Sequence, residues 1–216
     1  MGGHDSDLLG RFQQEAKGLG IDLAPRQLGQ FAHYLRLLRE WNRVFRLVAR
    51  DDEETVVWVH FMDSLSACPL LRAGESLLDV GSGAGFPGVP LKIACPSVRL
   101  TLVESRGRKV SFLKQLVREL DLRDVAVHAG RIEQLDLKGR FDTIISRALA
   151  PPQRWLSWVF PLLEEEGRIV LMLGPRYEMA ELEGQLHETG LSLCGSLDLR
   201  LPVVGHRRRL AVLRRG

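Results

Sequence analysis

The sequence predicts an α/β protein with a mainly parallel, seven-stranded sheet of the Rossmann-like type, preceded by a group of N-terminal helices. Two observations carry this prediction. From Glu75 onward, short apolar runs alternate with helical patterns, as expected for parallel strands joined by crossover helices. The first of these runs ends in a glycine-rich turn over residues 81–88. Turns of this kind hold ligands at the carboxyl edge of open α/β sheets.

Seven apolar runs are expected to form the strands. The first five are Ser76–Val80, Arg99–Glu104, Val125–Ala129, Phe141–Ser146 and Arg168–Leu173. The last two, Leu191–Leu201 and Arg208–Arg214, follow each other across a turn that contains Pro202 and Gly205. A hairpin cannot continue a right-handed parallel crossover, so we expect the sheet to end with an antiparallel strand.

Two helices are expected near the start of the chain. Ser6 or Asp7 can cap the first, which runs to about Lys17. Pro25 suits the first turn of the second, in which apolar residues recur at helical spacing and form one buried stripe. The stripe consists of Leu28, Phe31, Leu35, Leu38 and Phe45. Arginines repeat at the same spacing on another face, which either binds an anionic partner or is merely solvated. They are Arg36, Arg39, Arg43 and Arg46.

Further helices are expected from Asp51–Glu54 towards Leu65, from Pro87, and over Arg108–Leu120 and Tyr177–Thr189. No repeat or flexible linker divides the sequence. We therefore expect residues 1–74 to form a helical extension that packs on a main domain of residues 75–216, as one compact unit.

Composition limits the class of protein. With 45% hydrophobic and 26% charged residues, the chain has the balance of an ordinary globular domain. No apolar run reaches the roughly 18 residues of a membrane span, and the first residues are too polar for a signal peptide. The three cysteines are scattered, which excludes a disulfide scaffold and a zinc ribbon. We therefore expect a cytoplasmic protein that contacts no membrane and holds no metal.

The formal net charge of +3 conceals three basic segments. Residues 26–50, 99–118 and 199–216 carry net charges of +5, +5 and +6, which leaves about −13 for the rest of the chain. Such a distribution indicates an anionic partner that is contacted at several places. Of the 30 basic side chains 25 are arginine, which suits phosphate binding, although a biased genome composition would produce the same preference.

The glycine-rich turn discriminates between two classes of cofactor. A dinucleotide fingerprint requires GxGxxG or GxGxxA, in which the third small residue lets helix and strand pack closely. Counted from Gly81, that third position is Phe86. Counted from Gly83, the pattern contains Pro87, which is awkward for a pyrophosphate on the helix end. Asp79 followed by GxGxG is instead the pattern of S-adenosylmethionine (SAM) methyltransferases.

Three further positions follow the ends of strands. Glu104 lies 23 residues after Gly81, where a carboxylate can accept hydrogen bonds from two ribose hydroxyls, unless it is a surface acid. Ile132 can cover one face of an adenine, and Glu133 can approach the exocyclic amine or cap a helix instead. Arg147 ends the fourth strand, where it can hold the cofactor carboxylate or the substrate, or form a plain salt bridge.

Several short motifs together resemble one methyltransferase family. They are Trp41-Asn42, His60-x-x-Asp63-Ser64, residues 79–88 with Pro90-Leu91, Lys109 with Phe112-Leu113, Arg131-x-Glu133 and Ser146-Arg147-Ala148. With this set the chain resembles the bacterial small-subunit ribosomal RNA guanine-N7 methyltransferases, also called glucose-inhibited division protein B. The resemblance implies the SAM-dependent methyltransferase version of the Rossmann-like fold, a SAM cofactor, and ribosomal RNA or the small ribosomal subunit as partner.

The turn and the resemblance together assign expected roles to single residues. Cofactor contacts are expected at Gly81, Gly83, Phe86, Glu104, Ser105, Arg106, Ile132, Glu133 and Arg147. The basic segments place the expected RNA contacts at Arg36, Arg39, Arg43, Arg46, Arg207, Arg208 and Arg209. The chain departs from the family pattern at Arg46, Val48, Val59 and Leu173, which removes polar groups near the expected RNA side.

Guanine N7 carries a lone pair and no proton, so methyl transfer to it needs no general base, and positioning supplies most of the rate. Arg147 is the expected positioning residue. His60 and Asp63 are three residues apart and can share a helix face, but a structural histidine is the preferred interpretation. Because N7 lies in the deep major groove of regular RNA, the target guanine is expected to be unpaired or flipped out. The protein is expected to act as a monomer.

Two other classes of function remain open. One is an NAD-type oxidoreductase, which Phe86 and the terminal hairpin disfavour. The other is an RNA-binding protein without catalysis, or a methyltransferase of small molecules. The three basic segments disfavour a small-molecule enzyme, which would gain little from them.

Overall fold

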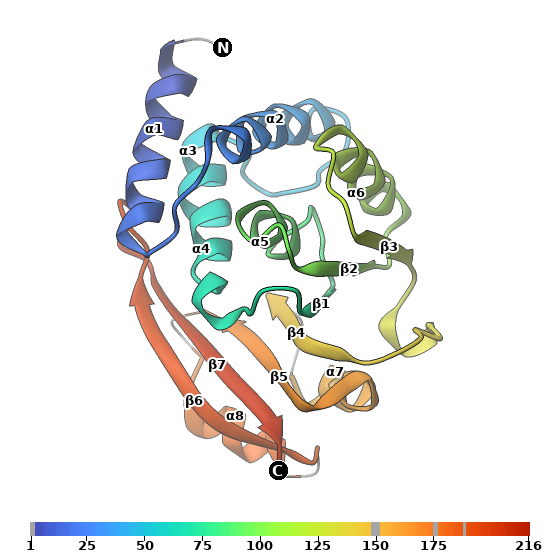
Figure 1. The fold of residues 1–216 in the computed structure, drawn as a ribbon. Coiled ribbons are helices and arrows are strands. Elements are labelled where there is room, and N and C mark those ends of the chain that lie inside the picture. The colour runs from blue at the N-terminus through green and yellow to red at the C-terminus, as the bar shows by residue number, and fades with distance from the viewer. Residues whose placement is uncertain (1–2, 148–151, 175–176, 188) are drawn as a thin grey trace.

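A mixed sheet of seven strands runs through the molecule in the computed structural model, which describes residues 3–147, 152–174, 177–187 and 189–216 (Figure 1). The strands are β1 (Ser76–Val80), β2 (Arg99–Glu104), β3 (Val125–Ala129), β4 (Phe141–Arg147), β5 (Leu163–Leu173), β6 (Leu191–Arg200) and β7 (Arg207–Arg215). Their order is β3-β2-β1-β4-β5-β7-β6. The pairs among β1 to β5 are parallel, and β7 pairs antiparallel with β5 and with β6. The predicted fold class is confirmed.

The C-terminal hairpin enters the sheet in reversed order. β7 lies between β5 and β6, so the later strand of the hairpin is internal and β6 forms the edge. Leu173 of β5 pairs with Arg209 of β7, which pairs in turn with Asp198 of β6. Arg200 pairs with Arg207 two positions further along. Because side chains alternate along a strand, these four charged residues of the hairpin share one face of the sheet.

Helices cover both faces of the sheet. They are α1 (Gly3–Gly18), α2 (Pro25–Asn42), α3 (Glu53–Thr55), the π-helix η1 (Val56–Phe61), α4 (Met62–Leu65), α5 (Gly88–Ala94), α6 (Gly107–Glu119), α7 (Pro152–Val159) and α8 (Met179–Leu186). Short 3-10 turns are η2 (Cys68–Leu70), η3 (Ile132–Gln134) and η4 (Phe160–Leu162). In Figure 1, α2, α4, α5 and α6 lie above the sheet, and α7 and α8 lie below it. Each set of helices packs on its own buried apolar cluster.

α1 and α8 have other bounds than the sequence predicts. α1 begins at Gly3, so the expectation that Ser6 or Asp7 caps it is wrong. Burial of Phe12 and its neighbours holds this helix, and helices in proteins depend on such packing more than on their caps. α8 spans Met179–Leu186 and is shorter at both ends than predicted.

α2 ends at Asn42 and does not reach Phe45. The side chain of Asn42 accepts hydrogen bonds from the backbone N–H groups of Leu47 (2.7 Å) and Val48 (3.0 Å), which turns the chain away from the helix axis. The middle of the predicted apolar stripe is buried, whereas its two ends, Leu28 and Phe45, are half-buried against the same core.

The helical segment from Glu53 to Leu65 contains a π-turn in its middle. Asp52 caps it, because its side chain accepts a hydrogen bond from Thr55 N (2.9 Å). The π-turn over Val56–Phe61 includes His60, and Asp63 follows in α4. π-turns inside helices are frequent at functional sites.

α2 is fastened to the glycine-rich turn and to α6. Tyr34 is fully buried, and its hydroxyl donates to Ala84 O at 2.5 Å. His33 Nε2 lies 2.7 Å from Glu119 Oε2. These contacts support our proposal that the helical extension and the main domain form one unit.

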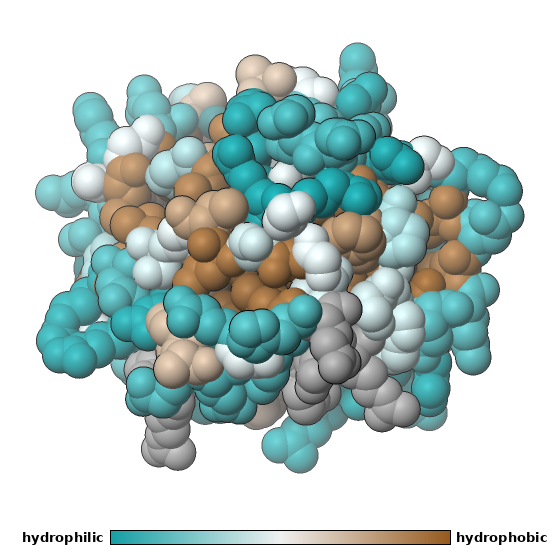
Figure 2. Space-filling view, turned by 90° about the horizontal axis from the view of Figure 1, so that it is seen from below, coloured by the Kyte–Doolittle hydropathy of each residue, from teal (hydrophilic) through white to brown (hydrophobic). Residues whose placement is uncertain are grey.

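The face of the molecule shown in Figure 2 is mostly hydrophilic at its rim. Hydrophobic residues gather in a recess near the middle and in smaller patches toward the left and right sides. Within the described ranges, the strongly exposed large hydrophobic side chains are Val44, Leu197 and Val203. The same ranges contain no helix that is both long enough and apolar enough to cross a membrane.

Tyr34→Phe should lower the free energy of unfolding by about 1–3 kcal/mol, because it leaves the buried Ala84 carbonyl without its donor. Chemical denaturation followed by tryptophan fluorescence and by far-UV circular dichroism measures this loss, and both probes should show one common transition. Tyr177→Phe is the matched control. Its hydroxyl donates to Gln185 Oε1 (3.0 Å) in a half-buried place, so the loss should stay below about 1 kcal/mol. Equal losses in the two variants would contradict this account.

Candidate active site

The glycine-rich turn connects the carboxyl end of β1 to α5. Gly81, Gly83 and Gly85 have φ values of +75°, +60° and +99°, which residues other than glycine rarely adopt. The backbone N–H of Gly81 donates to Val103 O (2.9 Å), which ties the turn to β2. A Cβ atom on Gly85 would lie 2.6 Å from the hydroxyl of Tyr34, so the packing of α2 on the turn requires glycine there.

Asp79 lies at the base of this turn and is 0% exposed. Its Oδ2 accepts a hydrogen bond from Gly88 N (2.9 Å), at the start of α5. Its Oδ1 has no hydrogen-bond partner among the described residues. Burial raises the pKa of Asp79 to about 7, against the Gly88 hydrogen bond and the charge of Arg147, which lower it. A buried carboxylate oxygen without a donor is the kind of atom that a bound ligand or water satisfies.

Glu104 ends β2 beside the turn. One of its carboxylate oxygens accepts from Gly83 N (2.9 Å), and the other accepts from Arg106 N (2.8 Å). Each oxygen retains a further lone pair, so two ribose hydroxyls can still donate to this carboxylate. The side chain is 6% exposed, which rules out the alternative of a surface acid.

A hollow of about 140 Å³ opens beside Gly81, and we call it the tryptophan hollow. Its walls are Val80, Gly81, Val103, Ser105, Gly130, Arg131, Ile132, Glu133, Trp155 and Trp158. Four of the predicted cofactor residues, Gly81, Ser105, Ile132 and Glu133, therefore meet at one place. The cap proposed as the alternative for Glu133 is not seen at η3, which begins at Ile132 after the N-cap residue Arg131 and has no side-chain capping bond.

Trp155 and Trp158 are site residues that the sequence prediction missed. Both come from α7, between β4 and β5, and they line the hollow opposite the turn. The available signal was compositional, because two of the four tryptophans of the chain stand three residues apart.

Arg147, at the end of β4, lies in a second hollow of about 310 Å³, which we call the Arg147 hollow. It is lined by Val59, His60, Asp63, Arg147, Met172, Leu173, Gly174 and Arg208. Arg147 donates to Asp63 Oδ2 (3.3 Å) and to His60 Nδ1 (3.4 Å), and its guanidinium lies 5.0 Å from the centre of the Phe86 ring. Arg208 Nε donates to the other oxygen of Asp63 at 2.9 Å.

The structure thus separates the predicted cofactor residues. Phe86 and Arg147 contact each other on the α4 side of the turn, and Arg147 lines the second hollow instead of the tryptophan hollow. The plain salt bridge considered for Arg147 is present, with Asp63 as its partner. Two of the departures from the family pattern, Val59 and Leu173, line the Arg147 hollow.

His60 is uncharged near neutral pH. Burial, followed by the charges of Arg147 and Arg208, lowers the pKa of His60 to about 3. Since Arg147 donates to Nδ1, the neutral ring carries its proton on Nε2. The ring stacks on Phe86 with centroids 4.9 Å apart, and Phe86 stacks on Tyr34 at 5.5 Å. The preferred interpretation of His60 as a structural histidine agrees with this packing.

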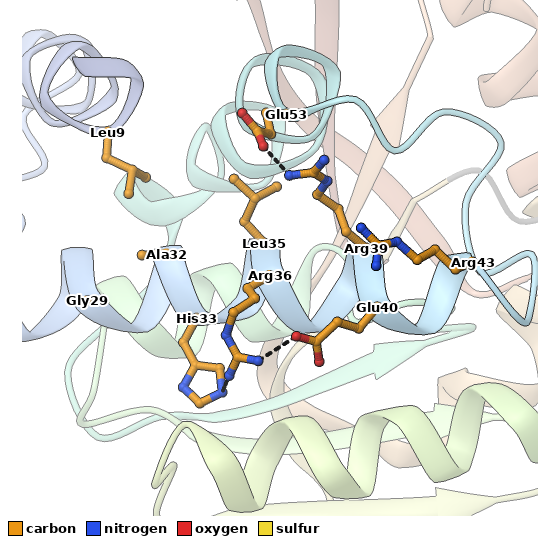
Figure 3. Close-up of a pocket in the computed structure, with 10 residues that line it drawn as sticks. All are labelled: Leu9, Gly29, Ala32, His33, Leu35, Arg36, Arg39, Glu40, Arg43 and Glu53. Atoms are coloured by element: carbon orange, nitrogen blue, oxygen red, sulfur yellow. Dashed lines mark hydrogen bonds and ion pairs between the residues drawn. The ribbon is translucent and has the colours of Figure 1, made fainter. Parts of the chain in front are cut away.

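Arg36, Arg39 and Arg43 border a groove of about 460 Å³ between α1, α2 and α3 (Figure 3). Arg43 and Arg46 follow the end of α2 at Asn42, so the expected helical stripe of four arginines is only half within the helix. Arg36 is paired with Glu40 (2.6 Å) and Arg39 with Glu53. Arg43 and Arg46 are exposed and have no acidic partner within the described part of the chain. In the C-terminal cluster, Arg208 belongs to the Arg147 hollow, whereas Arg209 is paired with Asp198. No group of His, Cys, Asp and Glu side chains among the described residues is arranged to hold a metal ion.

The chain is similar to a group of curated methyltransferases. A family model described as "GidB: rRNA small subunit methyltransferase G" matches residues 27–211. A ribosomal RNA small subunit methyltransferase G of Pseudomonas aeruginosa is 37% identical over 98% of this chain and 96% of its own length. The corresponding protein of Syntrophus aciditrophicus is 36% identical over 94% of this chain and 88% of its own length.

Solved structures with the same architecture include a SAM-dependent methyltransferase and a protein with bound AdoMet. A TehB-like SAM-dependent methyltransferase from Corynebacterium glutamicum has a TM-score of 0.58 at 19% identity, and the match covers 86% of this chain and 99% of that one. TYW2 of M. jannaschii in complex with AdoMet has a TM-score of 0.59 at 16% identity, covering 73% and 76% of the two chains. At these identities the likeness shows the fold, which is the methyltransferase version of the Rossmann-like fold.

Asp79→Asn should gain stability relative to the wild type as the pH rises. Because the pKa of Asp79 is about 7 in the folded protein and 3.8 in an ordinary setting, the folded state holds a proton between these values that the unfolded state has lost. The wild type therefore loses stability from about pH 4 to pH 7. The difference in unfolding free energy between variant and wild type, measured at pH 5 and pH 8, should shift in favour of the variant by more than about 1 kcal/mol.

The contribution of His60 to the unfolding free energy rises with pH, but His60 is present in both proteins and its contribution cancels from that difference. Asp142→Asn is the control. Hydrogen bonds from Ser76 lower the pKa of Asp142, so its contribution is complete at both pH values and the same difference should stay constant. A pH-independent difference for Asp79→Asn would show that this carboxyl is ionised in the folded protein at pH 5.

Proposed function

Since the chain belongs to the rRNA small subunit methyltransferase G family, we propose that it transfers the methyl group of SAM to N7 of a guanine in small-subunit ribosomal RNA. By family it is an rRNA methyltransferase and SAM-dependent. The guanine-N7 assignment comes from the resemblance of the motifs, and the observation that supports a substrate site beside a cofactor site is the pair of hollows at the carboxyl edge of the sheet. One begins at Gly81, after β1, and the other at Arg147, after the neighbouring strand β4. The NAD-type and non-catalytic alternatives are not favoured.

The tryptophan hollow and the glycine-rich turn fit SAM. The φ values of Gly81 and Gly83 let the backbone approach a ligand closely. Glu104 would accept the ribose hydroxyls, Ile132 and the two tryptophans would cover the adenine, and Glu133 would accept from its amine. Ser105 and Arg106 follow Glu104 at the mouth of the same site, and the unpaired Oδ1 of Asp79 offers an acceptor at the base of the turn. When bound, SAM supplies an electrophilic methyl group.

Arg147 would act on the guanine by position and not by proton transfer. The ion pair with Asp63, the bond to His60 and the face of Phe86 fix the guanidinium on three sides. N7 gives up no proton, and both oxygens of Asp63 are already occupied by arginines. The methylated base is cationic, so an additional charge on His60 would oppose its formation. The low pKa of His60 keeps that ring neutral.

The partner would be ribosomal RNA or the small ribosomal subunit, with the target guanine unpaired or flipped into the Arg147 hollow. Arg43 and Arg46, which follow the end of α2, remain free to meet phosphates. Arg36 and Arg39 would have to give up their partners Glu40 and Glu53 to do so. We further propose that the enzyme works in the cytoplasm as a monomer.

Incubation with labelled SAM and small ribosomal subunits from a strain that lacks the gene, followed by nucleoside analysis, tests the proposal. We expect 7-methylguanosine as the product. Its absence from both the subunits and the naked RNA would overturn the assignment.

Arg147→Ala should lower kcat by about 100-fold, since loss of positioning alone can cost that much. The dissociation constant of SAM, measured by calorimetry, should stay within a few-fold of the wild type. A large loss of SAM affinity at unchanged kcat would instead make Arg147 a cofactor-binding residue. Arg72→Ala, at an exposed arginine, is the control and should change neither quantity.

Arg43→Gln combined with Arg46→Gln should weaken RNA binding and flatten the slope of log affinity against log salt by roughly 1.4, as expected for two lost contacts to single-stranded phosphates. Arg72→Gln with Arg123→Gln removes the same charge from two exposed sites elsewhere and should leave the slope unchanged. Equal salt slopes in the two double variants would mean that Arg43 and Arg46 are merely solvated.

A further inference from the structure

A third hollow, of about 360 Å³, lies at the C-terminal hairpin, and we call it the hairpin hollow. It is lined by Gly174, Tyr177, Asp198, Leu199, Arg200, Arg207, Arg208 and Arg209. Gly174 and Arg208 also line the Arg147 hollow, so the two hollows adjoin. They meet at Gly174, where an added Cβ atom would have no described atom within 4 Å.

The charges in this hollow are only partly balanced. Asp198 holds Arg209 through two hydrogen bonds (2.5 and 2.7 Å), and Asp63 holds Arg208. Arg200 and Arg207 are exposed and have no acidic partner in the part of the chain that the structure describes.

Arg200 and Arg207 also stand directly opposite each other, at the first rung of the hairpin. Like charges at paired positions of an antiparallel ladder are destabilising. An anion placed between the two guanidinium groups would remove that repulsion, and a phosphate accepts hydrogen bonds from both.

Tyr177 adds an aromatic surface to the same hollow. Its ring packs on the buried cluster beneath α8, and its hydroxyl is held by Gln185. The ring is half-buried, and the buried cluster and Gln185 hold it in place. Leu199 adds an apolar side chain to the lining of the same hollow. A fixed aromatic ring beside free arginines is the combination that binds a base and its phosphate in single-stranded nucleic acid.

We propose that the hairpin hollow binds the nucleotide next to the target guanine, with its base stacked on Tyr177 and its phosphate between Arg200 and Arg207. The inference rests on the proposed function, because it takes the target guanine to lie in the Arg147 hollow. The chain of the RNA crosses the sheet edge over Gly174. The neighbouring nucleotide is thereby held on the α8 side of the sheet, while the guanine is held on the α4 side.

Steady-state kinetics with small-subunit RNA test the phosphate contact. Arg200→Gln combined with Arg207→Gln should raise KM for RNA by about 10-fold and leave kcat and SAM affinity unchanged, as for a contact made equally in the ground and transition states. Arg214→Gln with Arg123→Gln, two exposed arginines away from the hollow, removes the same charge and should leave KM within about twofold. An equal rise in both double variants would reduce the effect to net charge and overturn the proposal.

The stacking contact has its own test. Tyr177→Ala should raise KM for RNA by about 10-fold, a loss within the range measured for base–aromatic stacking. Tyr177→Phe keeps the ring and should restore the wild-type value. An unchanged KM in Tyr177→Ala would overturn the stacking.

A binding measurement separates failure of this inference from failure of the proposed function. Six-nucleotide single-stranded RNAs with one central guanine are compared with the same RNAs carrying abasic neighbours. The abasic change should weaken binding to the wild type but should not weaken it further in Tyr177→Ala. Additive losses would overturn the inference even if 7-methylguanosine is formed. Non-additive losses without methylation would uphold the nucleotide site and overturn the proposed reaction.

Discussion

The pairing of the Asp63 carboxylate with two arginines is the interaction on which the Arg147 hollow depends. Asp63 is 2% exposed, and its two oxygens bind Arg147 and Arg208, which lie 84 and 145 residues further along the chain. One side chain of the helical extension thus joins the ends of β4 and β7. A buried charge is tolerated only when it is paired, and removal of one member of such a pair costs about 3–5 kcal/mol. Loss of any one of the three residues therefore destabilises the other two, and together they fix the shape of the Arg147 hollow.

The same cluster determines the protonation of its neighbours. Two arginines and one carboxylate leave a local excess of positive charge, which together with burial keeps His60 neutral. A neutral ring can stack closely on Phe86, and Phe86 in turn stacks on Tyr34. Through this stack the glycine-rich turn is packed against both α2 and the π-turn. Electrostatics around Asp63 and apolar packing around Tyr34 thus support one arrangement.

Local patterns in the sequence predict much of this molecule. The alternation of apolar runs predicts six strands to within one residue, but β5 begins at Leu163, five residues before the predicted Arg168. The spacing of Gly81, Gly83 and Gly85 predicts the turn and the carboxylate of Glu104 beside it. These features depend on neighbours in the chain, so a linear pattern encodes them.

What the sequence does not reveal is decided by contacts between distant residues. The helical periodicity of the sequence predicts a face of arginines, but it does not indicate that Glu40 neutralises Arg36 and that Glu53 neutralises Arg39. Trp155 and Trp158 reach the tryptophan hollow only because the fold brings α7 beside Gly81 and Ile132. The hairpin is recognisable from its turn, yet the position of β7 inside the sheet depends on which of the two hairpin strands pairs with β5.

That position has a consequence for the order in which the molecule can be completed. β6 is synthesised before β7 but reaches the sheet only through β7, so it emerges from the ribosome as a strand with no partner. Arg208 arrives on the same late strand, and until it does, Asp63 has one of its two cations. The Asp63 cluster is therefore complete only after β7 has joined the sheet. A nascent chain that ends at β6 includes the glycine-rich turn but lacks Arg208, the second cation at Asp63.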